Sequence, residues 1–200
     1  MKKKPEPRNI TKAEISLETR NGKNVIKKDY RTRNFLVRIY GRFTLRNEAR
    51  AYTRLAGLEG IPHFHGFEGT QAIVLEYIPS RTLKGIPRGT IPVQVFDKLD
   101  ELVSKIHSRG VAVSDLHGSN ILLTEEGGVY IVDFANAFFA RTPENPGFIV
   151  RFFMQLDRHA ATRIRARYLK LQEPEPQGLF GSLYKAGRLL KKASRKIRRH

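Results

Sequence analysis

The chain has 200 residues and a mass of 22.9 kDa, enough for one domain or for two small lobes that share a core. It contains no cysteine, which excludes a disulfide framework, thiolate catalysis and Cys-ligated metal centres. The net charge of +18 is unevenly placed: residues 55–150 hold 7 basic and 11 acidic side chains, whereas residues 151–200 hold 14 and 3. We therefore expect an anionic partner to meet the ends of the chain.

No apolar run approaches the ~20 residues that cross a bilayer. The basic start Met1–Lys4 is followed by Pro5–Arg8, where a signal peptide would need an apolar core. These features predict a cytoplasmic protein, with peripheral contact at the inner face of a membrane left open.

The first part of the chain is rich in predicted strands. After a basic tail, an alternating apolar and polar segment meets Asn21-Gly22, a hairpin turn signal, and a second strand follows. A helix is predicted next from apolar residues spaced 4, 3 and 4 apart, and then a second strand pair. The predicted N-lobe covers residues 10–78, after a tail at 1–9, with strands at 13–19 and 24–28, a helix at 43–58, and strands at 63–69 and 71–77.

The second part is mostly helical. The segment 78–91 is rich in Pro and Gly and is the predicted connector between two lobes. The expected fold class is therefore α+β in two lobes, a strand-rich N-lobe and a mostly helical C-lobe. The C-lobe is predicted at 79–176, with helices at 93–109 and 149–171 and strands at 120–123 and 129–132, and a basic amphipathic C-terminal helix at 177–200.

Three polar side chains fall at the ends of neighbouring elements in the C-lobe. Asp115 and Asn120 lie in the loop between a predicted helix and a strand, and Asp133 follows the next strand. Oxygen ligands of this kind suit Mg²⁺, which completes its shell with water and substrate phosphates.

The segment Asp115-Leu116-His117-Gly118-Ser119-Asn120 resembles the catalytic loop of the protein-kinase-like superfamily, and Asp133-Phe134-Ala135 resembles its metal-binding motif. The segment 72–79 resembles the strand and hinge that hold adenine. Residues 25–27 resemble the strand with the phosphate-binding lysine, and residues 46–50 resemble the helix with its glutamate partner. The motifs follow the family's order over about residues 13–160, and are most similar to the compact atypical branch: RIO-type kinases, the small kinase of the KEOPS complex, and lipopolysaccharide core-sugar kinases.

The resemblance implies a two-lobed protein-kinase-like fold with a reduced N-lobe and a mostly helical C-lobe. It also implies ATP and Mg²⁺ as cofactors and assigns roles to single residues. Asp115 would accept or orient the proton of the hydroxyl group that receives the phosphate, and Asn120 and Asp133 would hold the metal. The lysine is expected to be Lys27, with Lys28 as its rival, because neighbours on a strand point to opposite faces. Glu48 would fix that lysine, and the backbones of Glu76 and Ile78 would bind adenine.

The sequence also departs from the family. No glycine-rich loop precedes the lysines, and Ser114 replaces the usual catalytic-loop arginine. The expected function is transfer of the ATP γ-phosphate to a hydroxyl of protein Ser/Thr or a lipopolysaccharide sugar. The alternative is a pseudokinase that binds a membrane, RNA or a protein partner through its basic ends.

Two basic segments carry further expectations. Arg42, Arg46, Arg50 and Arg54 recur every fourth residue, which indicates a solvated helix face or a phosphate-facing patch. Residues 177–200 contain no acidic side chain and are predicted to pack on the C-lobe, to lie on an anionic membrane, or to bind RNA. The sequence gives no oligomeric state.

Overall fold

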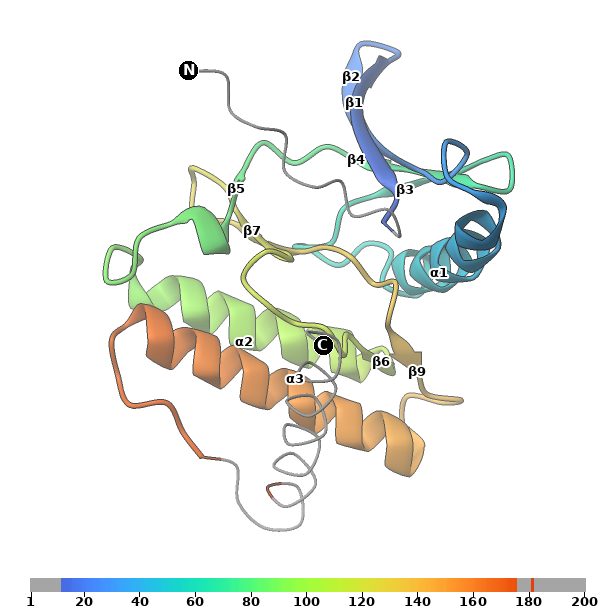
Figure 1. Ribbon diagram of the computed structural model, residues 1–200. Coiled ribbons are helices and arrows are strands. Elements are labelled where there is room, and N and C mark those ends of the chain that lie inside the picture. The colour runs from blue at the N-terminus through green and yellow to red at the C-terminus, as the bar shows by residue number, and fades with distance from the viewer. Residues whose placement is uncertain (1–11, 176–180, 182–200) are drawn as a thin grey trace, which may run out of the picture.

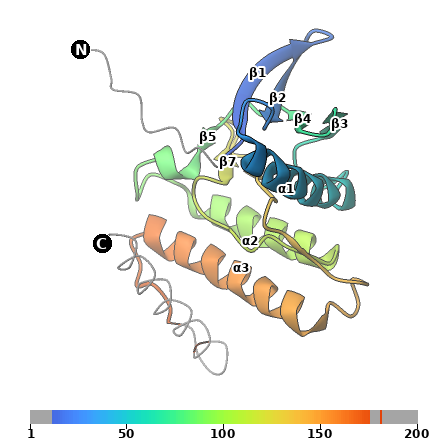
Figure 2. The same ribbon diagram turned by 45° about the vertical axis from the view of Figure 1, so that its right-hand side comes forward.

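A computed structural model describes residues 12–175 and Gly181. The expected N-terminal tail and nearly all of the expected C-terminal helix at 177–200 lie outside these residues. A curved sheet and helix α1 (Phe35–Arg54) form an upper lobe. Two long helices, α2 (Val93–Ser108) and α3 (Gly147–Tyr168), form the base of a lower lobe (Figure 1). Turned by 45°, the molecule shows α1 between the sheet and the pair α2 and α3, which run side by side (Figure 2). The predicted two-lobed α+β architecture is confirmed.

The N-lobe sheet is antiparallel, in the order β1-β2-β4-β3. The β1–β2 turn is the predicted one: Asn21 has φ 49° and Gly22 has φ 74°, the left-handed pair that a tight hairpin requires. The strands are β1 (Glu14–Arg20), β2 (Lys23–Asp29), β3 (Phe64–Glu68) and β4 (Ala72–Glu76).

The helix of the N-lobe starts earlier than expected. Helix α1 spans Phe35–Arg54, not 43–58, and the side chain of Asn34 caps it by accepting from the Val37 N–H at 3.0 Å. The first half of α1 has apolar residues on its exposed face as well as on its buried face. Five of the eight residues at 35–42 are apolar and they lie on both faces, which obscures the 3.6-residue period and hid the first two turns.

The C-lobe is built on two helices and short strand pairs. Helix α2 (Val93–Ser108) matches its predicted span to within a residue, and α3 (Gly147–Tyr168) begins two residues early and ends three early. One small sheet has the order β5-β7-β8, and a second pairs β6 with β9. The short elements are β5 (Arg81–Thr82), η1 (Leu83–Gly85), β6 (Val111–Ala112), β7 (Ile121–Leu123), β8 (Val129–Ile131) and β9 (Phe138–Phe139).

One apolar cluster runs through both lobes. It joins Leu45 and Tyr52 of α1 and Ile73 of β4 to Phe96 of α2 and to Phe134, which follows β8. Because the lobes share this core, loops from each are held in fixed positions against the other. Among the described helices, none has the length and apolar composition of a membrane span.

Candidate active site

A buried ion pair lies where the N-lobe meets the C-lobe. The Nζ of Lys28, on β2, is 2.5 Å from Oε1 of Glu48 on α1 and 3.6 Å from Oδ1 of Asp133. Glu48 is only 2% exposed. The pair therefore connects the sheet, α1 and the loop after β8 at one point.

The charge of Lys28 is maintained by its neighbours. Burial opposes the ammonium, but the carboxylates of Glu48 and Asp133 outweigh it and hold the pKa of Lys28 above its usual value. Burial raises the pKa of Glu48, and the ammonium of Lys28 offsets part of that effect. Lys28 is thus a fixed cation in a largely enclosed site.

The expectation that Lys27 would be the partner of Glu48 is wrong. Lys27 pairs with Val74 and Lys28 with Ile73 across β2 and β4, so their side chains leave opposite faces of the sheet. The Nζ of Lys27 lies 2.6 Å from Glu68 and 3.4 Å from Glu18, on the outer face. The rival, Lys28, is the lysine that enters the site.

Asp133 occupies a constrained position after β8. Its φ is 69°, a left-handed conformation that is uncommon for a residue with a side chain and that clusters at functional sites. Its N–H donates to the hydroxyl of Tyr52 at 3.4 Å, and the ring of the next residue, Phe134, packs edge-on against Tyr52 at 5.2 Å. Nδ2 of Asn47 donates to the carbonyls of Ala135 and Ala137. Helix α1 therefore fixes both the start and the continuation of this loop.

The loop between β6 and β7 brings Asp115 and Asn120 to the same region. Nδ2 of Asn120 donates to the carbonyl of Asp115 at 3.2 Å, and the carbonyl of Asn120 accepts from the Val132 N–H at 2.9 Å. The side chain of Asp115 is 52% exposed, and its Oδ2 is 3.8 Å from Nε2 of His117. The loop of Asp115 and Asn120 is thus hydrogen-bonded to Val132, the residue before Asp133, which itself contacts Lys28.

A residue that the sequence analysis missed supports this loop. Asp157 of α3 is 1% exposed, and its carboxylate accepts from the N–H groups of Val113 at 2.7 Å and Ser114 at 2.8 Å. Nε2 of His107 lies 3.1 Å from the same carboxylate. Ser114 has φ 62°, and its hydroxyl donates to the carbonyl of Asn136, so the two loops are also joined directly. A sequence signal was present, because Asp157 interrupts the apolar stripe Val150, Met154, Ala161 and Ile164.

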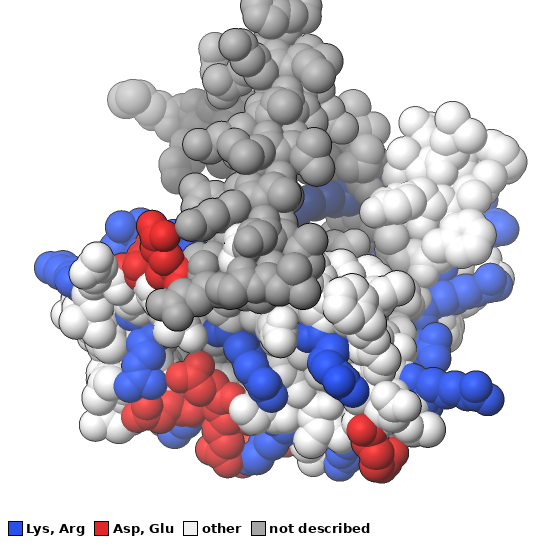
Figure 3. All heavy atoms as spheres, turned by 90° about the horizontal axis from the view of Figure 1, so that it is seen from below, with Lys and Arg blue, Asp and Glu red and all other residues white. Residues whose placement is uncertain are grey.

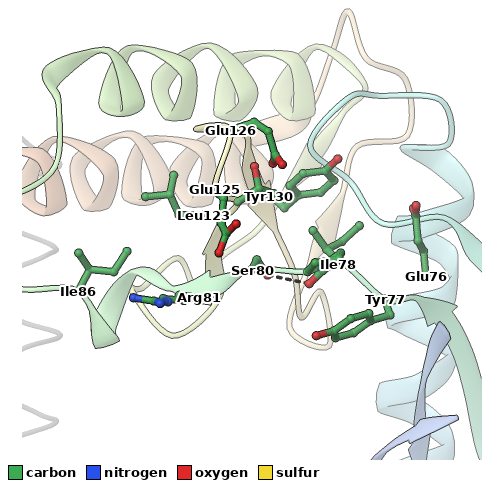
Figure 4. A pocket seen from close by; sticks show the side chains of 12 residues that line it. Glu76, Tyr77, Ile78, Ser80, Arg81, Ile86, Leu123, Glu125, Glu126 and Tyr130 are labelled. Carbon is green, nitrogen blue, oxygen red and sulfur yellow. Dashed lines mark hydrogen bonds between the residues drawn. The ribbon is translucent and has the colours of Figure 1, made fainter.

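The expected hinge residues lie at the connection between the lobes. Glu76 ends β4, and its carboxylate accepts from the His63 N–H at 2.9 Å. Glu76 and Ile78 line a pocket of 840 Å³ with Glu126 of the β7–β8 turn and Tyr130 of β8 (Figure 4). Glu76 pairs with Val25, whose side chain shares a face with Lys27, so its own side chain points away from Lys28. This pocket is therefore on the outer side of the hinge and contains none of the catalytic candidates.

The sheet face that carries Lys28 has exposed apolar side chains. Leu17 of β1 pairs with Ile26 of β2, and Ile26 pairs with Leu75 of β4, so these three residues form one row across the sheet. Ile26 lies two residues before Lys28 and shares its face. Leu17 is 56% exposed and Ile15, two residues earlier, is 63% exposed. An apolar surface beside a buried ammonium suits a ligand with a flat ring and a phosphate.

The donors fit a magnesium ion that is shared with a phosphate. Among the described residues, no group of three or more His, Asp or Glu side chains could enclose a metal. Asp133 offers a 42% exposed carboxylate, and the amide of Asn120 has its nitrogen engaged by Asp115, which leaves its oxygen free to coordinate. One carboxylate and one amide oxygen, completed by water and phosphate, is a usual magnesium shell.

Comparison with known proteins finds kinase-like relatives over parts of the chain. No family model matches the sequence. A Bacillus subtilis protein provisionally named a serine/threonine-protein kinase, YrzF, is 31% identical over 90 residues, which are 44% of this chain and 41% of that protein. A Methanosarcina mazei protein named a probable bifunctional tRNA threonylcarbamoyladenosine biosynthesis protein is 36% identical over 74 residues, 36% of this chain and 13% of that protein. The chain thus spans less than half the length of either relative.

Solved structures match nearly the whole chain. The Rio2 kinase of Chaetomium thermophilum, in a complex with ADP, Mg²⁺ and phosphoaspartate, has a TM-score of 0.64 at 14% identity and covers 87% of this chain and 58% of its own. A second structure of that kinase has a TM-score of 0.65 at 15% identity, with 88% and 60% covered. Together with the order of the motifs, these similarities show that the chain has the protein-kinase-like fold, in a compact two-lobed form similar to that of the atypical RIO kinases.

Proposed function

We propose that the chain is a Mg²⁺- and ATP-dependent phosphotransferase that moves the γ-phosphate of ATP to a hydroxyl acceptor. One observation supports this most directly: a buried glutamate fixes the Lys28 ammonium within 3.6 Å of Asp133. A fixed cation beside a metal-binding carboxylate is the arrangement that positions and neutralises a triphosphate.

Each side chain then has a defined task. Lys28 binds the α- and β-phosphates, and Glu48 keeps its ammonium in place. Asn120 and Asp133 hold Mg²⁺, which neutralises charge on the phosphates when it is bound. The half-exposed carboxylate of Asp115 orients the acceptor hydroxyl and takes its proton. Glu76 and Ile78 bind the adenine edge through their backbones, and the row of Leu17, Ile26 and Leu75 covers the ring.

The conformation of the site needs no phosphorylated loop. The catalytic loop lacks the arginine that conventional kinases place next to the catalytic aspartate, and Ser114 stands there. Its hydroxyl joins the loop to Asn136, and Asp157 holds the two N–H groups beside it. These contacts would keep Asp115 in position in the unmodified chain.

The test is nucleotide binding and turnover by the full chain. Purified protein is titrated with ATP with and without Mg²⁺ and is then given radiolabelled ATP with a protein Ser/Thr acceptor, sugar acceptors, or no acceptor. We expect Mg²⁺-dependent binding and transfer to one acceptor class. Binding without transfer to any acceptor would favour the pseudokinase alternative, and no binding would refute the assignment of the site.

A further inference from the structure

The first half of α1 exposes a large apolar surface. Phe35 is 71% exposed, Leu36 75%, Tyr40 54% and Phe43 66%, and Ile39 is 37% exposed between them. At about 100° per residue, these five side chains occupy one continuous arc of the helix. The arc lies opposite the buried side, which carries Gly41, Leu45, Glu48 and Tyr52. The helix is therefore apolar on the face that packs on the lobe and on the face directed away from it.

Such a face is unusual for a helix at a protein surface, where the exposed side is normally polar. In the second half of α1, the side chains on this same side of the helix contact other parts of the protein. The side chain of Asn47 binds the carbonyls of Ala135 and Ala137, the guanidinium of Arg50 lies 4.3 Å from the ring centre of Phe139, and Arg54 donates to the carbonyl of Ala140. In the described structure, no segment covers the first half in the same way.

The charged residues around the exposed apolar face of α1 indicate what kind of surface could cover this face. Residues 31–54 contain seven arginines and one acidic residue, Glu48, which is buried against Lys28. Arg42 and Arg46 are exposed and border the apolar arc. From below, Lys and Arg side chains are spread over the whole view, including the right-hand edge, the side where α1 and the start of α3 lie in Figure 1, whereas most Asp and Glu side chains lie left of centre (Figure 3).

We propose that this exposed face of α1 is a docking surface for an anionic phospholipid membrane. Aromatic and aliphatic side chains such as Phe35 and Leu36 enter the boundary between head groups and acyl chains, and Arg42 and Arg46 meet the lipid phosphates. RNA would pair with the arginines but has no site for Leu36 and Ile39, and a second copy would bring the same arginines against one another. The lipid surface satisfies both the apolar and the cationic part of the face.

The opposite side of the same helix carries Glu48. An α-helix with its side chains is about 10 Å across, so a docked α1 places the Lys28–Glu48 pair roughly that far from the lipid surface. The protein would then work next to the membrane without any span through it. This inference depends on α1 alone and stands whether or not the chain transfers phosphate.

The experiment compares four full-length proteins by co-sedimentation with vesicles of phosphatidylcholine alone or mixed with phosphatidylglycerol, at low and high salt. The double variant Leu36→Ser/Phe43→Ser removes apolar side chains, and Arg42→Gln/Arg46→Gln removes charge. Leu171→Ser is the control, since Leu171 is 61% exposed and lies in the segment that follows the end of α3. Binding of a labelled RNA, thermal unfolding and elution volume are recorded for every protein alongside.

We expect the wild type and Leu171→Ser to sediment with anionic but not with neutral vesicles. The apolar variant should bind anionic vesicles at least about tenfold more weakly at either salt concentration, and the arginine variant should lose binding most clearly at low salt. Wild-type levels of vesicle binding by Leu36→Ser/Phe43→Ser would overturn the proposal and place any membrane contact elsewhere in the chain. A wild-type dimer that this variant converts to monomer would assign the face to a second copy, and RNA binding that the variant loses while no vesicle binding is seen would assign it to RNA.

Discussion

The Nζ of Lys28 lies 2.5 Å from the carboxylate of Glu48. The Nζ of the adjacent Lys27 lies on the other face of the sheet, 2.6 Å from the carboxylate of Glu68 on β3. Two neighbouring lysines thus have different environments. The partner of Lys28 is buried at 2% exposure, and the partner of Lys27 is a surface carboxylate at 32%. This difference distinguishes a residue of the proposed site from a residue of a surface ion network.

Replacing each lysine separates the two roles. Lys28→Met should lower kcat/KM for ATP by about 100-fold or more, because a fixed cation at the phosphates is lost. Lys27→Met is the matched control and should leave turnover within about twofold of the wild type, since Lys27 contacts Glu68 on the opposite face of the sheet from the proposed site. Steady-state kinetics with varied ATP provide the measurement, and a defect confined to Lys27→Met would contradict the assignment.

Lys28→Met leaves the Glu48 carboxylate buried without its cation, which costs about 3–5 kcal/mol in comparable sites. The double variant Lys28→Met/Glu48→Gln removes that charge as well. It should unfold at a higher temperature than Lys28→Met and should be equally inactive, so that loss of activity can be separated from loss of folding.

Asp133→Ala should abolish Mg²⁺-dependent transfer with little effect on folding. Its carboxylate is 42% exposed and lies 3.6 Å from Lys28, so its removal should change the free energy of unfolding by only about 1 kcal/mol. Phosphate transfer and thermal unfolding are measured on the same preparation. Activity close to that of the wild type would show that the metal is held by other residues.

Asp157→Ala should affect both folding and turnover. It leaves the N–H groups of Val113 and Ser114 without their acceptor, at about 1–3 kcal/mol for each buried group. Urea unfolding should show a loss of about 2–6 kcal/mol, and kcat should fall while KM for ATP changes little, because Lys28 is untouched. Asp97→Ala is the control: Asp97 forms an exposed ion pair with Arg165 and should be nearly neutral.

Glu68 should make stability depend on pH in the acid range. Hydrogen bonds from Lys27, Arg20 and Arg31 lower the pKa of Glu68 from 4.5 to about 2. An acid whose pKa is lower in the folded state stabilises the fold above its unfolded pKa, and this contribution is lost as the pH falls from about 4.5 to about 2. The wild type should therefore unfold at a higher temperature than Glu68→Gln at neutral pH, and the two melting temperatures should converge near pH 2. A constant difference across this range would mean that the ion network does not act through the Glu68 charge.

The sequence by itself determined the two-lobed fold and the order of its motifs. Local patterns predicted three elements that the structure contains. These are the first hairpin, from its alternating residues, its turn at Asn21 and Gly22, and helix α2, from its apolar stripe. Asp115, Asn120 and Asp133 are candidates from the sequence because they occur at fixed spacing beside short apolar strands. Such features depend on neighbours along the chain, which the sequence contains in full.

The choice between Lys27 and Lys28 was decided only by the tertiary structure. Both residues fit the same strand, and a shift of one residue reverses which side chain meets α1. The pairing of Ile26 with Leu75 and of Lys28 with Ile73 sets that register, and it depends on strands nearly 50 residues apart in sequence. The role of Asp157 has the same origin, because its partners Val113 and Ser114 lie more than 40 residues before it in the chain. The partner in a long-range contact cannot be found from the periodic pattern of nearby residues. Only the packed fold brings the buried carboxylates of Glu48 and Asp157 to their hydrogen-bond partners.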